Sequence, residues 1–215
     1  MITNSNGKVP KIYHGTTTVG LVCVDGVVFA TDTRVTADGY VAHKKGKKLY
    51  KIADNLAMTI AGTVADAQNV IDIIRFYVKK YELEHQMKIP IKAAATLASN
   101  IFSANRLFPL VTQVIMGGTD DGVPSLFQID FFGSLTEEKV VSTGSGSPIA
   151  YSILESSYSP SQNTKEGVKI AAKAVLTAMK RDTATGESFD ISVIDSNGYR
   201  ELDPKTKNEL IKDLW

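Results

Sequence analysis

The stretch TTVGLVCVDGVVFATDT, residues 17–33, decides how the fold begins. Two runs rich in β-branched residues, 17–24 and 27–33, lie on either side of Asp25-Gly26. Asp-Gly between two such runs is a strong signal for a β-hairpin with a short turn. The sequence therefore predicts that the domain begins with an antiparallel pair of strands.

The rest of the chain alternates between strands and pairs of helices. Apolar residues at helical spacing predict helices, whereas β-branched runs bounded by turn residues predict strands. The further predicted strands are 40–43 paired with 48–53 across a turn near Gly46, then 55–61, 111–117, 125–131, 139–142, and 188–195 paired with 199–202 over Asn197-Gly198. The predicted helices are 63–84, 90–106, 148–158, 164–181 with Asn163 as its cap and Glu166 three residues on, and a short one at 204–215.

This order of elements predicts the architecture. Strands joined by hairpins form antiparallel sheets, and paired helices with one apolar stripe must cover them. We expect an α+β fold, a four-layer αββα sandwich of two antiparallel sheets flanked by helix pairs. The sequence shows no internal repeat and no linker, so residues 16–215 are expected to form a single domain.

Composition excludes several functional classes. The 24 basic and 23 acidic side chains leave a net charge of +1, which gives no electrostatic reason to expect nucleic acid or an anionic membrane as a partner. No apolar run approaches the roughly 20 residues that a membrane span needs. The single cysteine, Cys23, cannot form an internal disulfide and is expected to fill a core position, which fits a reducing, cytoplasmic location. His14, His43 and His85 lack metal-ligand spacing, so no metal and no cofactor is expected.

The dipeptide Gly15-Thr16 suggests a catalytic nucleophile. A hydroxyl is a weak nucleophile until a base removes its proton. If cleavage made Thr16 the first residue, its own α-amine, which titrates at about 7.7 to 8.0, would be suited to that task. Gly15 would leave the preceding carbonyl open to attack. Read alone, three threonines at the start of a strand are also explained by β-propensity.

Five further motifs follow in order along the chain: Thr31-Asp32-Thr33-Arg34-Val35-Thr36, Gly46-Lys47-Lys48-Leu49-Tyr50, Ala61-Gly62, Thr143-Gly144-Ser145-Gly146-Ser147-Pro148 and Arg181-Asp182-Thr183-Ala184-Thr185-Gly186. Together with Gly15-Thr16 they resemble the proteasome β subunits of archaeal type, which are N-terminal-nucleophile hydrolases. The resemblance covers essentially the whole chain from Gly15 onward. It implies a threonine endopeptidase with the N-terminal-nucleophile hydrolase fold.

The resemblance also implies roles for individual residues. Thr16 would supply the nucleophilic oxygen and, after cleavage at Gly15-Thr16, the basic amine. Lys48 would lower the pKa of the Thr16 hydroxyl and stabilise developing negative charge, with Asp32 pairing and orienting it. The backbone N–H of Gly62 would bind the oxyanion.

Outer residues of the same implied site are Ser145 and Asp182, which would hydrogen-bond around the threonine and its amine. Thr185 stands where the family usually has a serine, so a hydroxyl is kept and a methyl added. Val35, Ile60 and Val64 would line the pocket for the residue before the scissile bond. Because these three are apolar, a chymotrypsin-like preference for large hydrophobic residues is expected.

The implied setting is a large particle. Rings of seven identical β subunits would stack back to back between rings of a proteasome α subunit, with an unfolding ATPase acting through the α ring on unfolded protein substrates. Residues 1–15 would be a propeptide that the chain removes autocatalytically.

Other interpretations stay open from the sequence. The chain could be a non-catalytic β subunit, an amidohydrolase of the same superfamily, or a subunit of the simpler bacterial two-ring protease; the Ser145 and Asp182 motifs favour the proteasome. Lys44 to Lys48 could be a solvated basic turn. Gly144 to Pro148 could indicate a phosphate site, but it lacks the glycine spacing of a dinucleotide fingerprint and the lysine of a P-loop.

Overall fold

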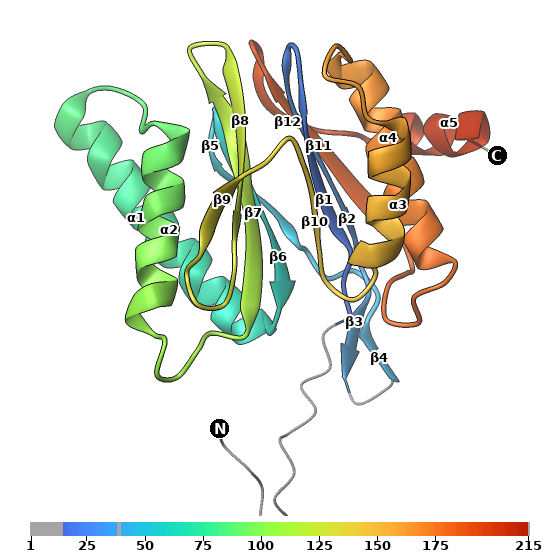
Figure 1. Ribbon diagram of the computed structural model, residues 1–215, viewed down its shortest axis with the longest axis horizontal. Helices are drawn as coiled ribbons and strands as arrows, with labels where there is room; N and C mark the ends of the chain where they lie inside the picture. Colours follow the sequence, from blue (N-terminus) through green and yellow to red (C-terminus); the bar gives the residue numbers. More distant parts are fainter. Residues whose placement is uncertain (1–14, 38–39, 215) are drawn as a thin grey trace, which may run out of the picture.

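A computed structural model describes residues 15–37 and 40–214 (Figure 1). Two five-stranded antiparallel sheets face each other, and a pair of helices covers the outer face of each sheet. The predicted four-layer α+β sandwich is therefore confirmed. The predicted propeptide up to His14, and Trp215 at the end of the last helix, lie outside the described residues.

The first sheet contains the hairpin predicted from residues 17–33. Its strand order is β10-β1-β2-β11-β12. Residues Thr18 and Thr31 face each other at one end of the β1–β2 pair, and Cys23 faces Gly26 at the turn. The bounds of these strands are Thr18–Cys23 for β1, Gly26–Asp32 for β2, Val140–Thr143 for β10, Phe189–Asp195 for β11 and Gly198–Glu201 for β12.

The second sheet has the order β5-β6-β7-β8-β9, a meander in which each strand pairs with the next. The bounds are Leu49–Ala53 for β5, Leu56–Gly62 for β6, Thr112–Asp120 for β7, Val123–Ile129 for β8 and Leu135–Glu137 for β9. Strand β9 was not predicted, because three residues are too few to show a periodic pattern.

The predicted pairing of 40–43 with 48–53 is wrong. Strand β4 (Tyr40–His43) pairs with β3 (Val35–Ala37), a strand that was not predicted, in a separate two-stranded sheet. Strand β5 instead pairs with β6, and its first residue, Leu49, is buried between the two large sheets. Gly46 donates its N–H to the carbonyl of Thr33 at 2.8 Å, so the segment before β5 crosses from one sheet to the other instead of turning back.

Four helices form the outer layers. Helices α1 (Val64–His85) and α2 (Ile91–Ala104) cover the second sheet, and α3 (Ser147–Ser157) and α4 (Thr164–Met179) cover the first (Figure 1). The predicted capping box is present at the start of α4, where Asn163 and Glu166 each accept the backbone N–H of the other. A fifth helix, α5 (Pro204–Leu214), packs its apolar residues against the core under α4.

Apolar side chains fill all three interfaces of the sandwich. One core lies between the second sheet and α1 and α2, another between the first sheet and its helices, and a third between the two sheets. Cys23, 1% exposed, belongs to the core beneath α4, as expected. Burial raises the pKa of its thiol to about 12, so the thiol stays protonated at neutral pH. In the described part of the chain, no helix is both long and apolar enough to cross a membrane.

Candidate active site around Thr16

Thr16 lies two residues before the start of β1 and is 4% exposed. It borders a cavity of about 250 Å³ that opens between the β3–β4 hairpin, the start of β5, the end of β6 and the start of α1. The hydroxyl of Thr16 donates to the carbonyl oxygen of Gly15 at 2.5 Å. The predicted nucleophile and the predicted scissile carbonyl therefore lie together in the wall of one cavity.

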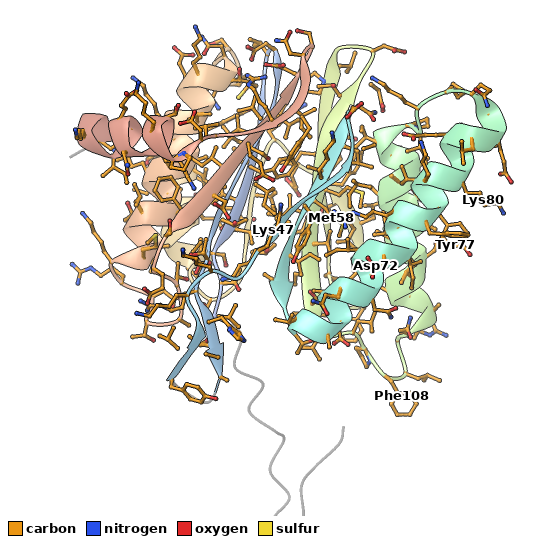
Figure 2. All side chains as sticks on the ribbon, turned by 180° about the vertical axis from the view of Figure 1, so that it is seen from behind. Lys47, Met58, Asp72, Tyr77, Lys80 and Phe108 are labelled. Carbon is orange, nitrogen blue, oxygen red and sulfur yellow. The ribbon has the colours of Figure 1, made fainter. Side chains whose placement is uncertain are left out.

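A buried ion pair lies beside this carbonyl. Lys48 Nζ donates to Asp32 Oδ1 at 2.7 Å and to the Gly15 carbonyl oxygen at 3.3 Å. Asp32 is the last residue of β2, and Lys48 precedes β5, where its own carbonyl accepts the N–H of Ile60 from β6 at 2.9 Å. Figure 2 labels the neighbouring Lys47 on this connection between the two sheets. The pair thus joins one sheet to the other.

Each oxygen of the Asp32 carboxylate accepts two hydrogen bonds. Oδ1 accepts from Lys48 and from the N–H of Thr17 at 2.9 Å, and Oδ2 accepts from the N–H groups of Arg34 and Gly186, both at 3.0 Å. Four donors fill the acceptor capacity of a carboxylate. They fix its orientation and, through it, the position of the Lys48 ammonium.

Burial shifts the pKa values of both partners toward the neutral forms. It raises the pKa of Asp32 above its ordinary value, against the lowering effect of Lys48 and of the backbone donors. It lowers the pKa of Lys48, against the raising effect of Asp32. A lysine with a lowered pKa gives up and regains a proton more readily near neutral pH than a solvated one does.

A second polar network lies on the other side of Thr16. The N–H of Thr16 donates to Ser145 Oγ at 3.3 Å, and Ser145 Oγ donates to Asp182 Oδ2 at 2.5 Å. Thr185 donates to the same carboxylate oxygen at 2.5 Å, which leaves its own oxygen to accept the hydroxyl proton of Thr17 at 2.8 Å. Ser145, Asp182 and Thr185 are thus brought together, with Ser145 adjoining the nitrogen that would become a free amine.

The four remaining predicted residues also line the cavity. Val35 comes from β3, Ile60 and Gly62 from β6, and Val64 from the first position of α1. Ile60 is 4% exposed, whereas Val64 at the mouth is 51% exposed. Gly62 has φ of +153°, a conformation that favours glycine. Every residue predicted from the sequence therefore adjoins Thr16, its cavity or its hydrogen-bond network.

Comparisons with known proteins identify the family of this chain. The protein family described as proteasome subunit matches residues 12–194, most of the chain. The chain belongs to the proteasome subunit family. Its α+β sandwich is the fold of the N-terminal-nucleophile hydrolases, the class predicted from the motifs.

Archaeal relatives resemble this proteasome subunit over nearly its whole length. The proteasome subunit beta of Archaeoglobus profundus is 45% identical over 205 residues, covering 95% of both chains. The proteasome subunit beta 2 of Ignicoccus hospitalis is 46% identical over 191 residues, covering 89% of this chain and 90% of that protein. The proteasome subunit beta of Methanococcoides burtonii is 45% identical, covering 94% of this chain and 98% of its own.

Several residues that shape the site of this proteasome subunit were not predicted from its sequence. The Arg34 guanidinium donates to the carbonyl of Thr183 at 2.8 Å and pairs with Glu187 at 3.2 Å, and so holds the segment that carries Asp182. Arg34 was part of a quoted motif, but no local pattern could indicate a contact across 149 residues of sequence. Thr36 and Tyr50, which end two of the quoted motifs, and His43 and Gln68 also line the cavity, although no local pattern assigned them a role.

Within residues 15–37 and 40–214, no group of three or more His, Cys, Asp or Glu side chains is arranged to hold a metal ion. His43 lines the cavity beside Thr16. His85 stacks on Tyr81 at the end of α1, with the ring centroids 4.2 Å apart. His14 lies outside the described residues.

Proposed function

We propose that this proteasome subunit is a catalytic β subunit, a threonine endopeptidase that cuts itself between Gly15 and Thr16 and then degrades unfolded proteins. One observation carries the proposal. The Lys48 ammonium, fixed by Asp32, reaches the carbonyl oxygen of the bond to be cut, and the Thr16 hydroxyl lies on the same oxygen. A cation buried against one particular backbone carbonyl is what electrostatic stabilisation of an oxyanion requires.

The first reaction is removal of the leader, residues 1–15. Thr16 Oγ attacks the carbonyl carbon of Gly15, its proton passes to the departing Thr16 nitrogen, and the C–N bond breaks. The result is an ester between Gly15 and Thr16, which water hydrolyses to release the leader as a carboxylate. Lys48 stabilises the negative charge that develops on the Gly15 oxygen during attack.

The second reaction is peptide hydrolysis. The freed amine of Thr16 takes the proton from its own hydroxyl, which attacks a substrate carbonyl to form an acyl-enzyme that water then cleaves. Ser145, held by Asp182, already contacts this nitrogen at 3.3 Å and would orient the amine lone pair. The backbone N–H of Gly62, at the edge of the same cavity, would donate to the substrate oxyanion.

Substrate preference follows from the cavity wall. Val35, Ile60 and Val64 present apolar surface beside Thr16, which supports a chymotrypsin-like preference for large hydrophobic residues before the scissile bond. An apolar pocket discriminates by only about 1 to 3 kcal/mol per methylene, so the preference should be broad. Fluorogenic peptides ending in Leu, Arg and Glu test this, and fastest cleavage after Arg would contradict it.

The assembly is proposed from the family. Membership of the proteasome subunit family means that the chain is part of a proteasome core particle. We extend this to heptameric β rings stacked back to back between α-subunit rings, fed with unfolded protein by an ATPase in the cytoplasm. Residues 1–15 would then keep Thr16 blocked until the chamber has closed.

The test is to co-express the chain with a proteasome α subunit and map the N-terminus of the assembled protein by mass spectrometry. The mature chain should begin at Thr16 and cleave fluorogenic peptides. Thr16→Ala should keep the leader and abolish peptide cleavage together. Thr96→Ala, which removes an exposed threonine on α2, is the matched control and should behave as wild type.

Two outcomes would reject the proposal. An assembled wild-type chain that still begins at Met1 and cleaves no peptide would indicate a non-catalytic β subunit. A small stable oligomer that is active without α subunits would indicate another enzyme of the superfamily.

A further inference from the structure

Asp66 lies in the first turn of α1 and is not part of the site described above. Its Oδ2 accepts two hydrogen bonds, one from the hydroxyl of Thr63 at 2.6 Å and one from the backbone N–H of Val111 at 3.0 Å. Thr63 is the N-cap of α1, and Val111 immediately precedes β7. The carboxylate therefore joins the start of the helix to the start of the strand that pairs with β6.

This contact completes the β6–β7 ladder at its last rung. Thr63 donates its N–H to the carbonyl of Val111 at 2.9 Å, one step beyond the pairing of Gly62 with Thr112. An antiparallel ladder would return a bond from the Val111 N–H to the Thr63 carbonyl. That carbonyl has instead turned into α1, where it accepts the N–H of Ala67 at 3.0 Å. Asp66 supplies the acceptor that the strand can no longer offer.

The position of Val111 in turn constrains Gly62. A Cβ built on Gly62 would overlap the carbonyl oxygen of Val111 and lie 2.5 Å from Thr112 Cα. The Gly62 backbone, with φ of +153°, is therefore packed directly on the segment that Asp66 holds. A shift of Val111 would free the Gly62 backbone, whose N–H is the proposed oxyanion donor, to change its orientation.

We propose that Asp66 is a positioning residue for the oxyanion donor at Gly62. The inference rests on the proposed function, because it concerns the orientation of that donor during peptide hydrolysis. Asp66 acts through Val111 and Thr63 on the backbone at Gly62 and does not touch substrate. Its contribution therefore belongs to the transition state, where the oxyanion exists, and not to ground-state binding of the peptide.

The test compares variants of the co-assembled particle. Asp66→Ala should lower kcat for a fluorogenic peptide by about 10- to 100-fold and change KM by less than about threefold. Affinity for a peptide aldehyde, whose adduct with Thr16 carries the oxyanion, should fall by the same factor as kcat. Asp66→Asn keeps a carbonyl oxygen for both donors and should restore most of the activity.

The matched control is Asp72→Ala. Asp72 is an exposed aspartate further along α1, on the outer face of the helix in Figure 2, and its loss should leave kcat unchanged. If Asp66→Ala fails to assemble, Thr63→Val, which removes one of the two hydrogen bonds, should show the same effect on kcat in smaller measure.

The outcomes separate this inference from the proposed function. Leader removal and peptide cleavage by wild type, combined with Asp66→Ala or Thr63→Val particles that keep wild-type kcat or change only KM, would overturn the role of Asp66 alone. A wild-type particle without any activity would overturn the proposed function first.

Discussion

Lys48 Nζ donates to Asp32 Oδ1 at 2.7 Å, and the two side chains are 8% and 0% exposed. A buried ion pair of this kind stabilises a protein little, because the cost of removing both charges from water offsets their attraction. Breaking it is costly, because one charge is then left alone. The pair is better explained by what Lys48 does next, which is to reach the carbonyl oxygen of Gly15 at 3.3 Å.

We predict that removing either charge abolishes leader cleavage. Lys48→Ala or Asp32→Asn should each lower stability, by about 3 to 5 kcal/mol for a fully uncompensated charge, and leave the chain starting at Met1. The double variant Lys48→Met with Asp32→Asn removes both charges and should lose less stability than the two single losses added together. Thermal unfolding and N-terminal mapping measure the two effects. An active double variant would contradict the role of the ammonium.

The pH dependence of leader cleavage should report the same pair, since no free amine exists before cleavage. The reaction needs Asp32 ionised and Lys48 protonated. The pKa of Asp32 is raised above the ordinary aspartate value of 3.8. As the pH falls, leader cleavage should therefore be lost before the pH reaches 3.8. The pKa of Lys48 is lowered below the ordinary lysine value of 10.5. As the pH rises, leader cleavage should therefore be lost before the pH reaches 10.5.

The measurement is the rate of leader release from freshly assembled precursor across buffers. Peptide hydrolysis needs the Thr16 amine in its neutral form, and the ordinary pKa of such an amine is about 7.7 to 8.0. As the pH is lowered, peptide hydrolysis should therefore be lost at a higher pH than leader cleavage. An alkaline limit of leader cleavage at or above 10.5 would contradict the assignment to Lys48.

Gly15→Ala should slow leader removal by at least about tenfold. A Cβ at this position would overlap the Cβ of Ala184 and lie 2.5 Å from both the Ala184 carbonyl oxygen and Thr36 Oγ1. The scissile carbonyl would have to move away from Lys48. The control is a chain expressed from Thr16 onward, which needs no leader removal and should cleave peptides normally. Leader removal from Gly15→Ala at the wild-type rate would contradict the prediction, because it would show that the site tolerates the added methyl group.

Thr185→Val should weaken the second network. Valine keeps the shape but removes the hydroxyl, so the buried Thr17 hydroxyl and Asp182 Oδ2 both lose a partner. We expect the free energy of unfolding to fall by about 1 to 3 kcal/mol and peptide hydrolysis to slow. Thr185→Ser keeps the hydroxyl and should retain activity. Equal activity of the two variants would exclude a role for this hydroxyl.

Local patterns predicted most elements of the fold. Helix α4 was predicted at Thr164 because its capping box lies within four residues, and the β1–β2 hairpin was predicted because Asp25-Gly26 is itself the signal. Strand pairing across longer distances was predicted less well. Nothing in Tyr40–His43 shows that it pairs with Val35–Ala37. The pairing becomes evident only in the folded chain, where Leu49 at the start of β5 is buried between the two large sheets and β5 pairs with β6.

The candidate site divides in the same way. Thr16, Asp32 and Lys48 could be identified because each belongs to a motif that resembles a known family. Arg34 and Asp66 could not be assigned a role, because their contacts join residues 149 and 45 positions apart. Such contacts depend on the relative placement of whole elements, which local sequence does not encode.

The sequence by itself determined most of the elements, the layer order and the side chains available for chemistry, because helical and strand periodicity and motif identity are properties of neighbouring residues. Only the tertiary structure decided which charges meet. Asp32 ends a strand of one sheet and Lys48 immediately precedes a strand of the other, so their 2.7 Å contact exists only once the two sheets have packed face to face. Packing also excludes water there, and it is this exclusion that shifts both pKa values and gives a single ammonium its effect on the Gly15 carbonyl.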